Sequence, residues 1–89
     1  MKSVWKYPLI INDDIILQMP GDAKPLHVDM QRGSPCLWAL VEPDRPMRTY
    51  RFRLAGTGHP ISEESVLYVG SFFMHDGDLV FHLFLVEAL

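Results

Sequence analysis

Residues 65–87 read SVLYVGSFFMHDGDLVFHLFLVE, which is two apolar runs of strand length joined at Asp76-Gly77. Asp-Gly between apolar runs is a strong signal for a β-hairpin, because both central residues of a type I′ turn need a positive φ. Each arm of this hairpin is apolar on both faces, whereas a strand that covers a core needs only one apolar face. We therefore expect the second face to be buried against another subunit or a ligand.

Shorter strand candidates fill the rest of the chain, and turns rich in proline, glycine, asparagine and aspartate separate them. The candidates are residues 4–11, 15–19, 26–31, 36–41 and 48–54. Pro8 has no N–H to donate, so the first candidate is expected at a sheet edge or at a bulge. The run 36–41 is apolar on both faces, which is typical of a central strand.

The pattern predicts one all-β domain over residues 1–89, with six to seven antiparallel strands in a small sandwich or open barrel and a long C-terminal hairpin. No segment has the apolar period of a helix, although one short helix at residues 62–66 stays open as an alternative. A domain of this size buries only about 60% of the surface of its unfolded chain. Self-association, as a homodimer or larger assembly, would supplement such a small core.

The composition argues against several classes of protein. A net charge of −3 does not suit a general duplex-DNA binder, whose affinity comes largely from neutralising phosphates. The single cysteine, Cys36, cannot form an internal disulfide, and no apolar run is long enough to span a bilayer. The apolar stretch at the N-terminus is too short for a signal peptide, so we expect a reducing cytosol.

The segment GTGHP is the first candidate for a binding site, through the residues Gly56, Thr57, Gly58 and His59. Two glycines allow successive backbone N–H groups to point in one direction, and such a nest binds anions. His59 adds a polar ring, which the following proline biases toward an extended backbone. The alternative interpretation is a tight connection that only turns the chain.

Two arginines lie directly before this segment. Arg51 and Arg53 are two residues apart in a predicted strand, so their side chains share one face. Guanidinium groups match the geometry of phosphate, which makes this face a candidate for a phosphorylated ligand. The alternative is a solvated face on which the arginines pair with carboxylates such as Asp29 or Glu42.

Aromatic and histidine side chains supply the remaining candidates. Trp5, Tyr7 and Trp38 could stack on a nucleobase, although such residues more often fill a core or an interface. The four histidines are not spaced like the ligands of a metal site, and no cofactor is expected. His82 lies among apolar residues, which favours an interior or interface position. The sequence contains no recognisable catalytic constellation, so we expect a protein that is not an enzyme.

Several blocks of the sequence resemble a known family. They are WKYPL (residues 5–9), CLWALVEPD (36–44), RFRLAGTGHPI (51–61), YVGSF (68–72) and LVFHLF (79–84). Together they are similar to a family of small uncharacterised proteins encoded in bacteriophage and prophage genomes. The resemblance covers nearly the whole chain and brings no activity with it. It implies a small viral protein that acts in the cytoplasm of a bacterial host.

Two functions of different classes follow as hypotheses. The first is an accessory protein that acts against host defence by sequestering a small nucleotide-type immune signal in an oligomer. Arg51 and Arg53 would bind phosphates, the residues of GTGHP would offer backbone donors, and an aromatic ring would stack on the base. The second is a protein–protein inhibitor of a host defence enzyme, similar in kind to an anti-CRISPR, because aromatic and arginine side chains dominate protein interfaces.

Overall fold

A computed structural model describes all 89 residues and contains seven strands and no helix. In chain order the strands are β1 (Ser3–Pro8), β2 (Asp14–Pro20), β3 (Lys24–Gln31), β4 (Ser34–Val41), β5 (Met47–Gly56), β6 (Leu67–Met74) and β7 (Leu79–Ala88). The expected all-β architecture is confirmed. None of these elements is a helix that could cross a membrane.

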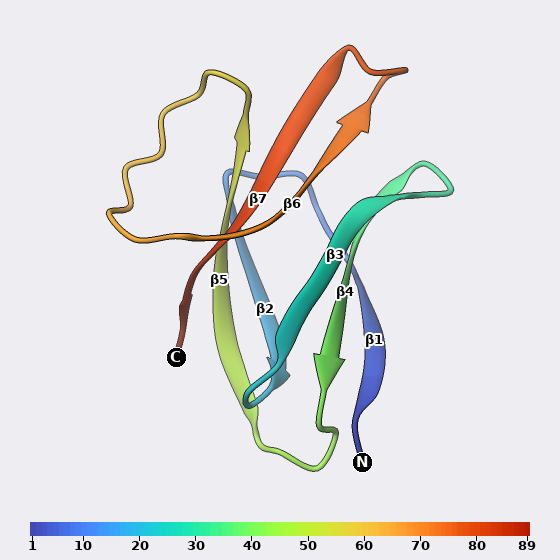
Figure 1. Cartoon of the computed structure of the whole chain (residues 1–89), viewed down its shortest axis with the longest axis vertical. Coiled ribbons are helices and arrows are strands. Elements are labelled where there is room, and N and C mark those ends of the chain that lie inside the picture. The colour runs from blue at the N-terminus through green and yellow to red at the C-terminus, as the bar shows by residue number, and fades with distance from the viewer.

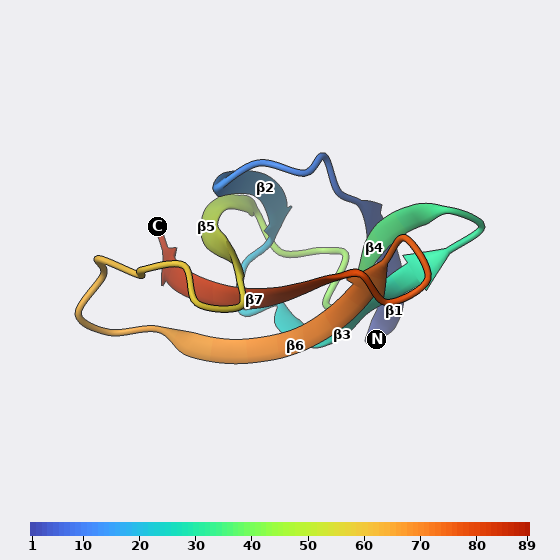
Figure 2. The same cartoon turned by 90° about the horizontal axis from the view of Figure 1, so that it is seen from above.

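The strands form two antiparallel sheets that pack as a sandwich (Figures 1 and 2). The first sheet has the order β1-β4-β3, which places β4 in the centre as its apolar sequence predicts. The second sheet has the order β2-β5-β7-β6. The edge strands β3 and β6 lie against each other, so the two sheets meet along that side. At this junction Gly70 of β6 faces Val28 of β3.

The core lies between the sheets and takes alternate residues from their strands. On β5, the side chains of Phe52 and Leu54 point inward and are at most 3% exposed, while Arg51 and Arg53 point to the opposite face. The other fully buried large side chains come from both sheets: Met19, Pro20, Val28, Leu37, Val41, Phe72 and Leu83. The face of β5 that carries the arginines is therefore the outer face of the four-stranded sheet.

The C-terminal hairpin forms as predicted from β6 and β7. Asp76 and Gly77 both have a positive φ, 54° and 92°, and the Asp78 N–H donates to the His75 carbonyl across them at 3.0 Å. His75 also has a positive φ of 52°, so the left-handed run is one residue longer than a two-residue turn requires. The connection spans residues 75–78 between Met74 and Leu79, which pair across the hairpin.

Two expectations about element boundaries are corrected. The first strand ends at Pro8 and does not continue to residue 11, because the chain leaves β4 after the Leu9 N–H donates to the Pro35 carbonyl at 2.9 Å. As predicted, this proline-containing strand lies at a sheet edge. Residues 62–66 form no helix and belong to the long β5–β6 connection. That connection passes β7 to reach β6, because β7 lies between β5 and β6 in the sheet (Figure 1).

Candidate functional site

Arg51 and Arg53 share the outer face of β5, as predicted, and both guanidinium groups are ion-paired there. Arg53 donates to both carboxylate oxygens of Glu63, with Nε at 3.2 Å and Nη2 at 2.5 Å. Arg51 Nε donates to Glu87 at 3.2 Å. Asp14 lies between the two arginines, 3.3 Å from Arg53 Nη2 and 3.7 Å from Arg51 Nη1. The five side chains form an arginine–carboxylate cluster with more negative than positive charge.

The partners of the arginines are not the predicted ones. Asp29 belongs to the other sheet and lies 3.5 Å from His27, and Glu42 pairs with Arg45. The actual partners come from β2, from β7 and from the β5–β6 connection. The interpretation of a paired arginine face is thus supported, and a phosphate would have to compete with carboxylates already in place. Phosphate binding by these arginines stays a prediction.

Glu63 anchors the β5–β6 connection onto the sheet. The hydrogen bonds from Arg53 hold the pKa of Glu63 below its usual value of 4.5, and the same bonds raise the pKa of Arg53. Because the folded-state pKa of Glu63 is the lower one, the pair stabilises the folded chain above pH 4.5. That stabilisation is lost as the pH falls through the folded-state value.

We predict that Glu63→Gln frees the connection at neutral pH. Amide hydrogen exchange in residues 57–66 should rise at pH 7, whereas the neighbouring Glu64→Gln should leave it unchanged because Glu64 forms no ion pair. The difference in unfolding free energy between wild type and Glu63→Gln should shrink as the pH falls below 4.5. Equal exchange in the two variants would show that the Glu63 ion pair does not hold the connection.

The GTGHP segment begins at the end of β5 and makes a tight turn. Gly58 has a φ of 87°, and the His59 N–H donates to the Gly56 carbonyl at 3.0 Å. The Thr57 N–H donates to the Val80 carbonyl at 3.3 Å, which ties the turn to β7. The Thr57 and His59 N–H groups are therefore already bonded, whereas a nest needs successive free N–H groups. The imidazole of His59 lies over Gly56, where an added Cβ would come within 2.9 Å of it.

A chain of hydrogen-bonded side chains connects this turn to the hairpin. Thr57 Oγ1 lies 2.8 Å from His82 Nε2, and Ser71 Oγ lies 2.7 Å from His82 Nδ1. The Tyr68 hydroxyl lies 2.8 Å from Ser71 Oγ. Both nitrogens of His82 therefore have a hydroxyl partner, so the ring is fixed in orientation. Serine beside histidine is also the pair used in nucleophilic catalysis, but here the second nitrogen bonds to a threonine where a triad has a carboxylate.

The polar pair Ser71–His82 was missed from the sequence, although a signal for it exists. A turn centred on Asp76-Gly77 pairs residue 71 with residue 82, which is the observed register. Strand alternation then places both side chains on the face opposite to Phe72. His82 is half-buried on this outer face and hydrogen-bonded within its own chain, so it does not lie in the interior. The interface position that its apolar neighbours also suggested stays a prediction.

Aromatic side chains flank this polar pair. We define the hairpin outer face as the six side chains that β6 and β7 direct away from the core, namely Tyr68, Ser71, Phe73, Val80, His82 and Phe84. Tyr68 is 59% exposed and Phe73 is 62% exposed. Phe84 is half-buried, and its ring centre lies 5.7 Å from that of Tyr68. The second face of the hairpin is therefore apolar and only partly covered by its own chain.

The predicted stacking residues lie elsewhere. Trp5 and Tyr7 of β1 pack against the core between the sheets. Trp38 of β4 points to the outer face of the three-stranded sheet, where its ring lies 5.9 Å from that of His27. That face is on the other side of the sandwich from the arginines. The structure thus brings Arg51 and Arg53 near the GTGHP segment but gathers none of the three aromatics with them.

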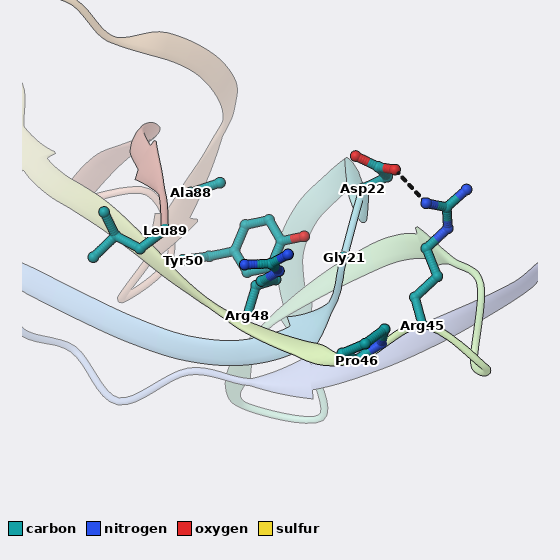
Figure 3. Close-up of a pocket in the computed structure, with 8 residues that line it drawn as sticks. All are labelled: Gly21, Asp22, Arg45, Pro46, Arg48, Tyr50, Ala88 and Leu89. Atoms are coloured by element: carbon teal, nitrogen blue, oxygen red, sulfur yellow. Dashed lines mark hydrogen bonds and ion pairs between the residues drawn. The ribbon is translucent and has the colours of Figure 1, made fainter.

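The largest depression, about 320 Å³, lies at the opposite end of β5 and contains none of the predicted site residues (Figure 3). Its ion pair joins Arg45 to Asp22 at 2.7 Å, while Arg48 has no acidic partner. The Tyr50 hydroxyl donates to the Pro20 carbonyl at 2.7 Å and accepts from the Ala23 N–H at 3.0 Å. These contacts hold the β2–β3 turn against β5. We therefore interpret the depression as the place where these segments join.

Comparison with known proteins identifies the family. A domain of unknown function, DUF7352, matches residues 1–89. The chain belongs to the DUF7352 family. No curated protein and no solved structure matches the chain. Membership of DUF7352 agrees with the resemblance to an uncharacterised family, and it brings no activity or ligand to the hairpin outer face.

Proposed function

We propose that this DUF7352 chain is a non-catalytic binding protein, that the hairpin outer face is its working surface, and that its partner is another protein. The observation that carries the proposal is the pair of exposed aromatics, Tyr68 and Phe73, on either side of the hydrogen-bonded pair Ser71–His82. Aromatic anchors beside fixed polar groups are typical of the centre of a protein interface. Because these aromatics stand on a two-stranded ribbon packed on the core, binding has no backbone segment to order.

The charges around this surface favour a protein over a phosphorylated small molecule. The two nearby arginines are paired with three carboxylates, and these would repel a phosphate. In the GTGHP turn the Thr57 and His59 N–H groups are bonded to carbonyls, so the turn offers no run of successive free donors to a phosphate. A protein partner needs neither a phosphate cradle nor a base-stacking pocket. Sequestration of a nucleotide-type signal is therefore the less supported of the two hypotheses.

The resemblance to bacteriophage and prophage proteins sets the context of the proposal. In that context the partner would be a protein of the bacterial host, encountered in the host cytoplasm. An inhibitor that covers the working surface of a defence enzyme would need no chemistry of its own. This part of the proposal rests on the family resemblance, and the argument from the surface is independent of it.

The partner can be trapped with a photoreactive amino acid at position 73, expressed in the bacterial host. A defined adduct is expected from position 73 and none from position 26, where Leu26 is exposed on the other sheet. The trapped protein is then purified and titrated against the untagged chain. Failure to bind in this purified system, or equal adducts from both positions, would overturn the proposal.

We predict that Phe73→Ser weakens binding to that purified partner at least tenfold, because an aromatic anchor at an interface contributes more than about 1.4 kcal/mol. Leu26→Ser is the matched control and should leave the affinity unchanged. A panel of cyclic and ADP-ribose-type nucleotides tests the competing function by thermal shift. A ligand at a hundred times its Kd would add about 2.7 kcal/mol of stability. Such a shift would favour sequestration, and turnover of the nucleotide would reveal an enzyme.

A further inference from the structure

β2 has a free edge that its own chain does not cover. It is the terminal strand of the four-stranded sheet and pairs only with β5. The Leu54 N–H donates to the Asp13 carbonyl at 2.9 Å, and this bond shows which residues of β2 direct their backbone groups toward β5. In an antiparallel pair every second residue bonds to the neighbour. The N–H and C=O groups of Asp14, Ile16 and Gln18 therefore point away from β5, toward the free edge.

The other edges of the sandwich are protected. The bond from the Leu9 N–H to the Pro35 carbonyl shows which residues of β1 bond to β4. The backbone groups of the alternate residues, Val4, Lys6 and Pro8, therefore point to the free edge of β1. A lysine and a proline are the usual devices against edge-to-edge pairing. The edges of β3 and β6 lie against each other. The remaining edge strand is β2, and residues 14–18 along its edge contain neither proline nor lysine.

We propose that a second copy of this chain pairs with this edge, β2 to β2, in an antiparallel two-fold arrangement centred on Ile16. The observation behind the choice of partner is that the edge is complementary to itself in this register. Ile16 then faces Ile16 of the second copy, and Asp14 faces Gln18. Each of these residue pairs can exchange two backbone hydrogen bonds. The two four-stranded sheets become one continuous sheet of eight strands across the dimer.

Neighbouring registers are less favourable. Moving the centre to residue 15 places Asp14 opposite Ile16, and moving it to residue 17 places Asp14 opposite Pro20, which has no N–H to donate. A shift that pairs even with odd residues turns the side chains to the wrong faces and mismatches the hydrogen-bonding groups. The register centred on Ile16 is the one that joins apolar to apolar and acidic to amide side chains.

The side chains that this pairing covers are apolar and exposed in the single chain. Ile16 is 60% exposed on the outer face of the sheet. On the inner face, Ile15 of one copy lies opposite the half-buried Leu17 of the other. A depression of about 270 Å³, lined mainly by apolar residues of the β1–β2 connection and β2, runs beside the same edge. The dimer thus gains both backbone hydrogen bonds and apolar contact.

The test is the mass in solution, measured by light scattering and sedimentation for the untagged chain. Wild type should show twice the 10.2 kDa monomer mass at micromolar protein. Ile16→Lys and Ile16→Glu should each be folded monomers, because they place like charges opposite each other at an exposed position. An equimolar mixture should restore a dimer, since lysine then faces glutamate. Phe73→Ser, on the hairpin outer face, should remain dimeric.

Hydrogen exchange reads the pairing directly. The amides of Ile16 and Gln18 should become protected as the wild-type concentration rises, while those of Ile15 and Leu17, bonded to β5, should be protected throughout. A wild-type monomer at high concentration would overturn the proposal. So would a dimer that Phe73→Ser disrupts and both Ile16 variants keep, since that result would place self-association on the hairpin. A mixture that stays monomeric would reject the two-fold register.

Discussion

Phe52→Ala is expected to remove most of the stability of this domain. Phe52 is fully buried at the centre of β5, the strand that pairs with both β2 and β7. Truncating a buried phenylalanine to alanine costs about 3–5 kcal/mol, because transfer energy is lost and a cavity remains. A chain of this length has a stability of roughly 4–13 kcal/mol, at 0.05–0.15 kcal/mol per residue. Urea unfolding should show a much lower midpoint, and the melting temperature should fall by more than about 10 °C.

Phe73→Ala is the matched control because the same side chain is removed from the exposed side of the hairpin. Phe73 is 62% exposed, so this variant should change the free energy of unfolding by no more than about 0.5 kcal/mol. The comparison separates the two faces of the four-stranded sheet: the inner one holds the fold, and the outer one is free to bind. A large loss from Phe73→Ala in the isolated chain would show that the hairpin outer face belongs to the core.

The strand pattern was predictable because it depends on local chemistry. The Asp76-Gly77 turn, the breaks at Pro20 and Gly33, and the doubly apolar run that became β4 are all visible in the sequence. The pairing of β2 with β5 and of β5 with β7 was not predictable. Those contacts join residues far apart in the chain, and their order depends on how the two sheets close around one core.

In the candidate site, too, the local features were predictable and the long-range contacts were not. Alternation alone places Arg51 and Arg53 on one face. Their carboxylate partners come from three separate segments, which only the assembled sheet brings together. For Trp38 the sequence gives the alternation but not which face is inward, since its strand is apolar on both sides. The Ser71–His82 pair was within reach, because the hairpin register depends only on the turn.

Gly70→Ala is expected to lower the free energy of unfolding. Overpacking typically costs about 1–3 kcal/mol, and we expect a loss near the upper end of that range. A Cβ at this position would lie 2.8 Å from Cγ1 of Val28 and within 3.7 Å of the Val28 backbone N. Val28 is 1% exposed and β-branched, so its side chain has little freedom to move away. The strain would act on the junction of β3 and β6, where the two sheets meet. Equilibrium unfolding in urea measures the loss.

Two further variants decide whether contact with Val28 is the cause. Val28→Ala removes the methyl group that an alanine at position 70 would strike, so the double variant should lose clearly less than the sum of the two single losses. Gly21→Ala is the glycine control, because its Cβ would meet nothing closer than 3.6 Å and should be tolerated. Additive losses in the double variant would mean that Gly70 is needed for another reason, such as the irregularity between Tyr68 and Gly70 in the pairing with β7. Compensation would show that the absence of a side chain at position 70 lets β3 and β6 close one side of the sandwich and hold the hairpin against the core.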